Sequence, residues 1–214
     1  MNSDSIVYAF SFCVPALVLV LAAQGIAATL GRSNRSRTVF AVQLVLALAL
    51  TCIPVDGLPL ARCIAGFNAN FSIPLVGLLV AAVWRNATSR QFLRPDDFRA
   101  AWIFGAASGV VLYPLALGLG SFDPYALGWD CSLIFIAVAA LTVGLIWKQN
   151  GFGVLLLAAV VAFNAGLLES TNFWDYLVDP FYFVASVITL GVGTLRARNG
   201  STESRATGAL STRN

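Results

Sequence analysis

The sequence predicts an all-α fold, a polytopic membrane bundle of seven transmembrane helices, and two features of its composition support this. Hydrophobic residues make up 58% of the 214 residues and charged residues 11%, whereas soluble domains have about 45–50% and about 25%. The apolar residues also form long continuous runs, which indicate helices, because membrane β-strands alternate apolar and polar residues. Histidine is absent, which excludes imidazole metal sites and serine–histidine catalytic sets.

Each predicted span is an apolar run near the length of about 20 residues that a helix needs to cross a bilayer. The predicted spans are Ile6–Leu30, Thr38–Val55, Gly66–Trp84, Ala100–Gly120, Cys131–Trp147, Phe152–Leu168 and Asp179–Arg198. Residues 1–198 are therefore expected to form one transmembrane domain. The small, polar residues 199–214 predict a disordered cytoplasmic tail. On the fourth span, Gly105 and Gly109 form a GxxxG pair that lets another helix approach closely.

The distribution of charge predicts the orientation of the bundle. Twelve of the 13 Lys and Arg residues lie in alternate connections and in the tail, and Arg62 lies on the other side. Seven of the ten acids lie with Arg62. Cytoplasmic loops are enriched in Lys and Arg, so we expect the N-terminus outside, the C-terminus in the cytoplasm, and a multi-pass location in the bacterial inner (cytoplasmic) membrane. This asymmetry accounts for the net charge of +3, and no nucleic-acid partner is predicted.

Two predicted external loops, 121–130 and 169–183, combine acids with aromatic residues, and each contains Asp-Pro followed by an aromatic residue. One interpretation is structural, because Asp before Pro favours a helix start and aromatic rings suit the membrane interface. The other is a site for a sugar, an amine or a divalent cation, since rings stack and carboxylates accept hydrogen bonds or charge. The candidate ligand-binding residues are Asp175, Glu169, Asp179, Asp123, Asp130, Trp174, Tyr176, Trp129, Asn164 and Asn68.

Asp175 is the acid in these loops for which the sequence gives no structural role. Asp123 and Asp179 precede prolines and are expected to cap helices, so Asp179→Ala should cost about 1 kcal/mol of stability. Asp175 stands between Trp174 and Tyr176, so we expect Asp175→Asn to lower function and to leave stability unchanged.

Two further groups of side chains lead to expectations about packing. Gln24 and Gln43, near the cytoplasmic ends of the first two spans, could hydrogen-bond to each other within a helical hairpin. The four cysteines, Cys13, Cys52, Cys63 and Cys131, match no metal or redox spacing. They are expected to be free thiols, although one pair near the outer helix ends could be oxidised.

The sequence contains no phosphate-binding glycine loop and no nucleophile elbow, so no cofactor, metal or catalytic residue is predicted. The function predicted first is non-catalytic and uses the acidic external face. The protein would be an accessory or scaffold subunit of other membrane subunits, or a binder of a lipid-linked sugar in envelope assembly. One alternative is a small transporter or channel for a cation, an amine or a lipid. Another is a membrane enzyme acting on a lipid headgroup, with Glu169 or Asp175 as acid or base.

Overall fold

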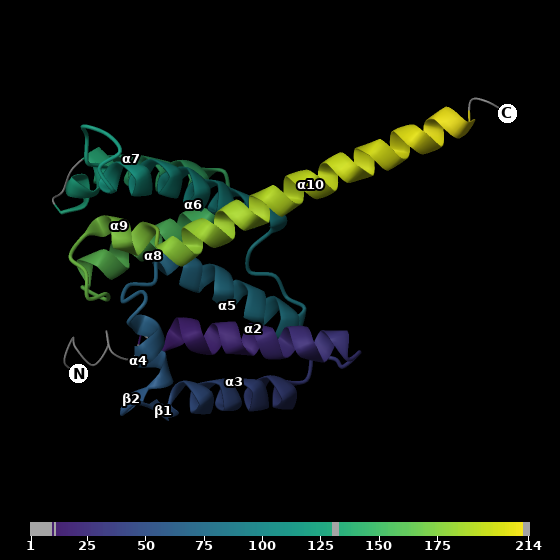
Figure 1. The fold of residues 1–214 in the computed structure, drawn as a ribbon, viewed down its shortest axis with the longest axis horizontal. Coiled ribbons are helices and arrows are strands. Elements are labelled where there is room, and N and C mark those ends of the chain that lie inside the picture. The colour runs from purple at the N-terminus through teal and green to yellow at the C-terminus, as the bar shows by residue number, and fades with distance from the viewer. Residues whose placement is uncertain (1–9, 11, 130–132, 212–214) are drawn as a thin grey trace.

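The structure is a computed structural model that describes residues 10, 12–129 and 133–211, and it is an all-α bundle (Figure 1). Its helices are α2 Cys13–Thr29, α3 Arg37–Thr51, α4 Leu60–Ala65, α5 Ile73–Thr88, α6 Pro95–Ala116, α7 Leu133–Trp147, α8 Phe152–Asn164, α9 Phe173–Leu177 and α10 Pro180–Ser211. A 3₁₀ helix, η1, covers Pro124–Gly128, and strands β1 (Pro54–Val55) and β2 (Leu58–Pro59) form an antiparallel hairpin. The all-α fold class is thus confirmed.

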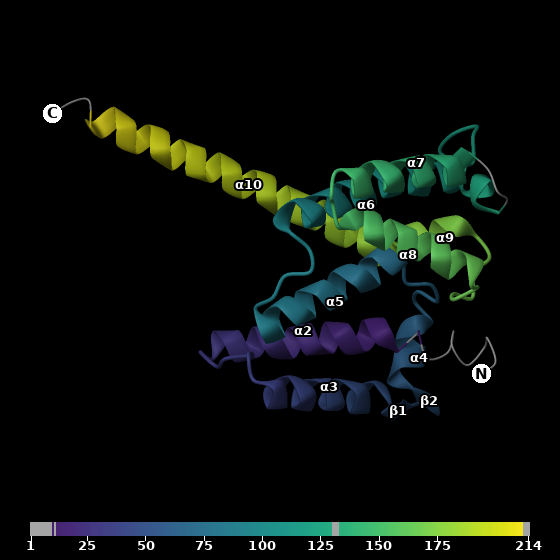
Figure 2. The same ribbon diagram turned by 180° about the vertical axis from the view of Figure 1, so that it is seen from behind.

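The long helices run back and forth between two ends of the bundle (Figures 1 and 2). We call one end the acidic end, formed by the connections 52–72, 117–129 and 165–179. The other is the basic end, formed by the connections 30–36, 89–94 and 148–151. The largest helix contact joins α6 and α10, and α2 packs on both α3 and α5. Most of the acids and most of the bases among the described residues therefore lie at opposite ends of the bundle.

Within the described residues, α6 is the one helix that is long and apolar enough to cross a membrane. The other apolar helices are shorter than the predicted spans, and α6 also ends before the predicted end of its span. Glycines in the left-handed conformation explain why two helices, α6 and α8, end early. Gly118 has φ +83° and stops α6 at Ala116, and Gly166 has φ +60° and stops α8 at Asn164. Residues 66–72 are not helical, because α5 begins only at Ile73 with Pro74 in its first turn.

The last helix differs from its prediction in the opposite direction. Helix α10 extends to Ser211 and includes most of residues 199–214, which were expected to lack regular structure. Extending an existing helix costs far less than starting a new one, since nucleation is the unfavourable step. Helix α10 is anchored by its packing on α6, so its polar end continues the helical path. It projects away from the bundle in Figure 1.

The close contact between α6 and α10 confirms the packing predicted from the GxxxG pair. A Cβ atom at Gly105 would overlap Tyr182 and Ser186, and a Cβ atom at Gly109 would overlap the ring of Phe183. Both glycines therefore give α10 room to approach. The main hydrophobic core includes residues of both helices and of their neighbours: Leu78, Leu112, Phe152, Leu156, Phe173 and Tyr182.

The predicted hydrogen bond between Gln24 and Gln43 is not formed. Gln24 Nε2 donates to the Val83 carbonyl at 3.3 Å, and Gln24 Oε1 accepts from Asn86 Nδ2 at 3.1 Å. Gln43 Nε2 instead donates to Asn34 Oδ1 at 3.2 Å. The prediction was wrong because α2 packs on α5 as well as on α3, so a third helix satisfies the Gln24 amide. Cys13, Cys52 and Cys63 are free thiols, and Cys131 lies outside the described residues.

Candidate functional site

The candidate site lies at the acidic end, where the two predicted external loops meet. Asn172 Nδ2 donates to the Tyr125 carbonyl at 3.0 Å, and Trp174 Nε1 donates to the Pro124 carbonyl at 2.8 Å. Asn172 Oδ1 also caps α9 by accepting from the Trp174 backbone N–H at 2.9 Å. Gly128 allows this approach, because a Cβ atom there would overlap Asn172 Oδ1. Loops 121–129 and 169–179 thus share one hydrogen-bonded structure.

Asp179 is the most strongly bonded acid of the site, with a side chain that is 2% exposed. Its Oδ1 caps α10 by accepting from the N–H groups of Phe181 at 2.9 Å and Tyr182 at 3.1 Å. Its Oδ2 accepts from the backbone N–H of Ser72 at 2.9 Å and from Ser72 Oγ at 2.6 Å. A longer contact of 3.4 Å comes from Asn68 Nδ2. The predicted cap is confirmed, and Asp179 also ties α10 to the start of α5.

Asp175 has a partner that the sequence did not reveal. Its Oδ2 accepts a hydrogen bond from the Tyr125 hydroxyl at 2.9 Å, so this carboxylate helps to join the two loops. Burial, together with the charge of Asp175 and this bond, raises the pKa of Tyr125 to about 12. The phenol therefore stays protonated and donates at neutral pH. The view that Asp175 has no structural role was therefore wrong. The sequence did not reveal this bond because Tyr125 is 50 residues distant along the chain.

A pocket of about 320 Å³ opens between these acids, which is at the small end of the range for ligand sites. Residues with two carboxylates, two amides and two phenols line it together with apolar residues. Its lining residues are Asn68, Asn70, Leu112, Tyr113, Ala116, Tyr125, Asp175, Val178, Asp179 and Pro180. Since Asp179 is already saturated with donors, the groups best placed for a ligand are those of Asp175, Asn68, Asn70 and Tyr113.

The other predicted site residues lie outside this pocket. Glu169 is exposed and pairs with Arg62 at 3.4 Å, and exposed Asp123 caps η1 through the Tyr125 N–H at 2.9 Å. The exposed Trp129 ring meets the Tyr125 ring edge-on, with centroids 6.0 Å apart. Asn164 bonds to a carbonyl of its own helix, α8. Asp130 lies outside the described residues.

Trp174 and Tyr176 are buried structural residues, although the sequence placed both among ligand-binding candidates. The Tyr176 hydroxyl donates to the Ser170 carbonyl and accepts from the Leu168 N–H, both at 3.1 Å. Burial raises the pKa of Tyr176, which favours this protonated, donating form. Both rings therefore hold the loop 165–179 in place, and neither lines the pocket.

The candidate ligand-binding residues predicted from the sequence left out four polar members of this site: Ser72, Asn70, Tyr113 and Tyr125. Tyr125 was visible as the aromatic residue after Asp123-Pro124. The others come from α6 and from the segment before α5, which was predicted to be helical. Among described residues, no three acid, cysteine or histidine side chains converge as a metal site.

Comparison of the chain with models of protein families, with curated proteins and with solved structures gives no match.

Proposed function

We propose that this chain is a non-catalytic, multi-pass protein of the bacterial inner membrane that binds the sugar headgroup of a lipid-linked saccharide at its acidic end. The observation that carries the proposal is this pocket, whose lining combines residues that bear carboxylates, amides and phenols with apolar residues. The hydroxyl groups of a sugar need such donors and acceptors, and the apolar face of its ring packs on apolar side chains. Binding of this kind would make the protein an accessory subunit in envelope assembly.

Membrane placement of the whole bundle is supported by the outward faces of its helices. Large apolar side chains are exposed on every long helix, for example Val18 on α2, Val45 on α3, Ile136 on α7 and Val161 on α8. Large apolar patches are rare on the surfaces of soluble monomers, and exposed apolar residues on every long helix are expected where lipid surrounds the bundle. Helices of 13–17 residues are short for a bilayer, and local thinning or flanking residues that reach the interface accommodate such a mismatch.

The pocket also limits which headgroup it can take. Asp175 and Asp179 put negative charge on its wall, which repels phosphate and favours a neutral or cationic group such as an amino sugar. A sugar attached through a diphosphate would therefore have to keep its phosphates out of the pocket.

Two alternatives, transport and headgroup catalysis, have less support. For transport, the buried Tyr182 beside the pocket residue Asp179 is held by packing: its N–H donates to Asp179, and its ring centroid lies 6.0 Å from that of Trp102. For catalysis, Asp175 already accepts a bond from a phenol and Glu169 already pairs with Arg62.

The sugar site is tested by saturation-transfer NMR with glucosamine and glucose on the full chain in nanodiscs. We expect transfer to glucosamine in the wild type, and its loss in Asp175→Asn and in Tyr113→Phe. Asp123→Asn is the matched control, because Asp123 is an exposed acid at the same end but outside the pocket. Absence of transfer in the wild type, or equal transfer in all four proteins, would disprove the sugar site.

The membrane orientation is tested separately with alkaline-phosphatase fusions. A fusion after Asp123 should be active and a fusion at the C-terminus inactive, because twelve of the 13 basic residues lie on one side. Activity at the C-terminus would exclude the seven-span orientation, whatever the result of the sugar experiment.

A further inference from the structure

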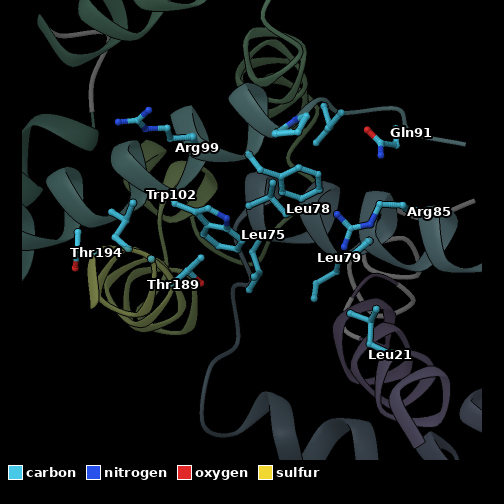
Figure 3. A pocket seen from close by; sticks show the side chains of 16 residues that line it. Leu21, Leu75, Leu78, Leu79, Arg85, Gln91, Arg99, Trp102, Thr189 and Thr194 are labelled. Carbon is cyan, nitrogen blue, oxygen red and sulfur yellow. The ribbon is translucent and has the colours of Figure 1, made fainter. Parts of the chain in front are cut away.

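A lateral cleft of about 820 Å³ lies toward the basic end. It lies between α5 and the pair α6 and α10, and α2 contributes Leu21. Its walls are mainly apolar: Leu75, Leu78 and Leu79 lie between Trp102 on one side and Arg85 on the other (Figure 3). Neither the sugar site nor the helix caps described above use this cleft.

A second, polar hollow of about 360 Å³ adjoins the cleft, and the two share Leu21 and Arg85. The second hollow is lined by Ser33, Arg35 and Ser89 from the basic connections and by Asn86 from the end of α5. An apolar cleft thus meets a cationic, hydrogen-bonding hollow at Arg85. The combined shape is amphipathic, with its polar part at the end where the basic residues gather.

The charged side chains that line this combined site are all positive. Arg35, Arg85 and Arg99 line the two hollows, and no described residue that lines either of them is an acid. The Arg85 guanidinium lies over the Phe98 ring, 5.7 Å from its centroid, and Arg85 is an exposed residue. Arg94 differs, since it bonds to Asp97 and to the Gln149 carbonyl.

We propose that this amphipathic site binds one phospholipid with an anionic headgroup. The phosphate would contact Arg85 and Arg35, and one acyl chain would lie in the cleft against Trp102 and the leucines of α5. Arginine guanidinium groups are suited to phosphate oxygens, and the apolar walls stabilise the chain by burial. The inference depends on the membrane placement proposed above and is independent of the sugar site.

Glycines on α10 provide a blocking variant and a matched control. Gly193 lines the cleft and Gly191 does not, and a Cβ atom at either would meet nothing within 4 Å. Gly193→Leu should therefore fill the cleft without strain, and Gly191→Leu makes the same change on another face. For charge, Arg85→Gln removes the central cation, and Arg32→Gln is the control because exposed Arg32 lines neither hollow.

The experiment measures retention of short-chain phosphatidylglycerol by the purified full chain, using native mass spectrometry, with short-chain phosphatidylcholine and glycerol 3-phosphate as competitors. We expect one phosphatidylglycerol per chain. Arg85→Gln should weaken binding by about tenfold, the factor expected for one charged contact. Gly193→Leu should abolish binding, and both controls should bind like the wild type. Thermal melting shows that each variant is folded.

Three outcomes would overturn the proposal. Equal retention of phosphatidylcholine would show an apolar cleft without headgroup recognition. Displacement of the lipid by glycerol 3-phosphate at equal concentration would show a site for a water-soluble phosphate. Equal loss of binding in Gly191→Leu and Gly193→Leu would show that the cleft is not the place of binding. Because the readout is lipid mass, failure here is separate from failure of the fusion or sugar experiments.

Discussion

Replacing Asp179 by alanine should destabilise the protein more than replacing any other acid at this end. The change removes the cap of α10, which costs about 1 kcal/mol. It also leaves the buried N–H and hydroxyl of Ser72, now at 2.9 and 2.6 Å from Oδ2, without an acceptor. A buried polar group without a partner costs about 1–3 kcal/mol, so the cap and the Ser72 N–H alone give an expected loss of about 2–4 kcal/mol, to which the hydroxyl adds. This exceeds the 1 kcal/mol that a cap alone predicts.

The measurement is reversible unfolding of the full chain by SDS titration in mixed micelles, followed by circular dichroism. Asp123→Ala is the matched control, because this exposed acid caps only η1 through one N–H at 2.9 Å. Its loss should cost less than about 1 kcal/mol. Ser72→Ala should recover part of the Asp179→Ala effect in the double variant, since it removes the hydroxyl that lost its acceptor. Equal destabilisation by Asp179→Ala and Asp123→Ala would refute the role of Asp179 as a buried link between α10 and α5.

Two further predictions concern the phenol of Tyr125 and the contact between α6 and α10. Folding raises the pKa of Tyr125 from about 10 to about 12, so its contribution to stability is complete below pH 10 and disappears as the pH rises to 12. The phenolate absorbance of Tyr125 is measured as the difference between the wild type and Tyr125→Phe, and it should rise near pH 12. In Asp175→Asn the midpoint of this rise should move to lower pH. An unchanged midpoint would exclude the charge of Asp175 as a cause of the raised pKa. Gly109→Ala should cost about 1–3 kcal/mol in the SDS titration, because its Cβ atom would overlap the Phe183 ring. Gly144→Ala, whose Cβ atom would meet nothing within 4 Å, should be neutral or stabilising, and equal costs would contradict the close packing of α6 on α10.

The sequence was a good guide to features that depend on short spacings. It located the long helices, the GxxxG contact and the cap at Asp179, since each follows from residues a few positions apart. It was a poor guide where the partner is distant in the chain. The Tyr125 bond to Asp175 and the Ser72 bonds to Asp179 join positions 50 and 107 residues apart. Helix ends were also misplaced, because continuous apolar composition hides the turn that glycine at positive φ produces.

The basic residues can serve two roles, because they can set the topology and one of them can also bind a ligand. Lys and Arg in alternate connections indicate topology, and that interpretation uses only their number and side. The structure separates them by their neighbours: Arg94 is held by Asp97 and the Gln149 carbonyl, whereas Arg85 lies where an apolar cleft meets a polar hollow. If the two arginines served only to set the topology, removing Arg85 and removing Arg94 should have the same effect on the protein. If Arg85 holds a lipid phosphate, its loss should change lipid retention, whereas loss of Arg94 should change the stability of the contact between α6 and the α7–α8 turn.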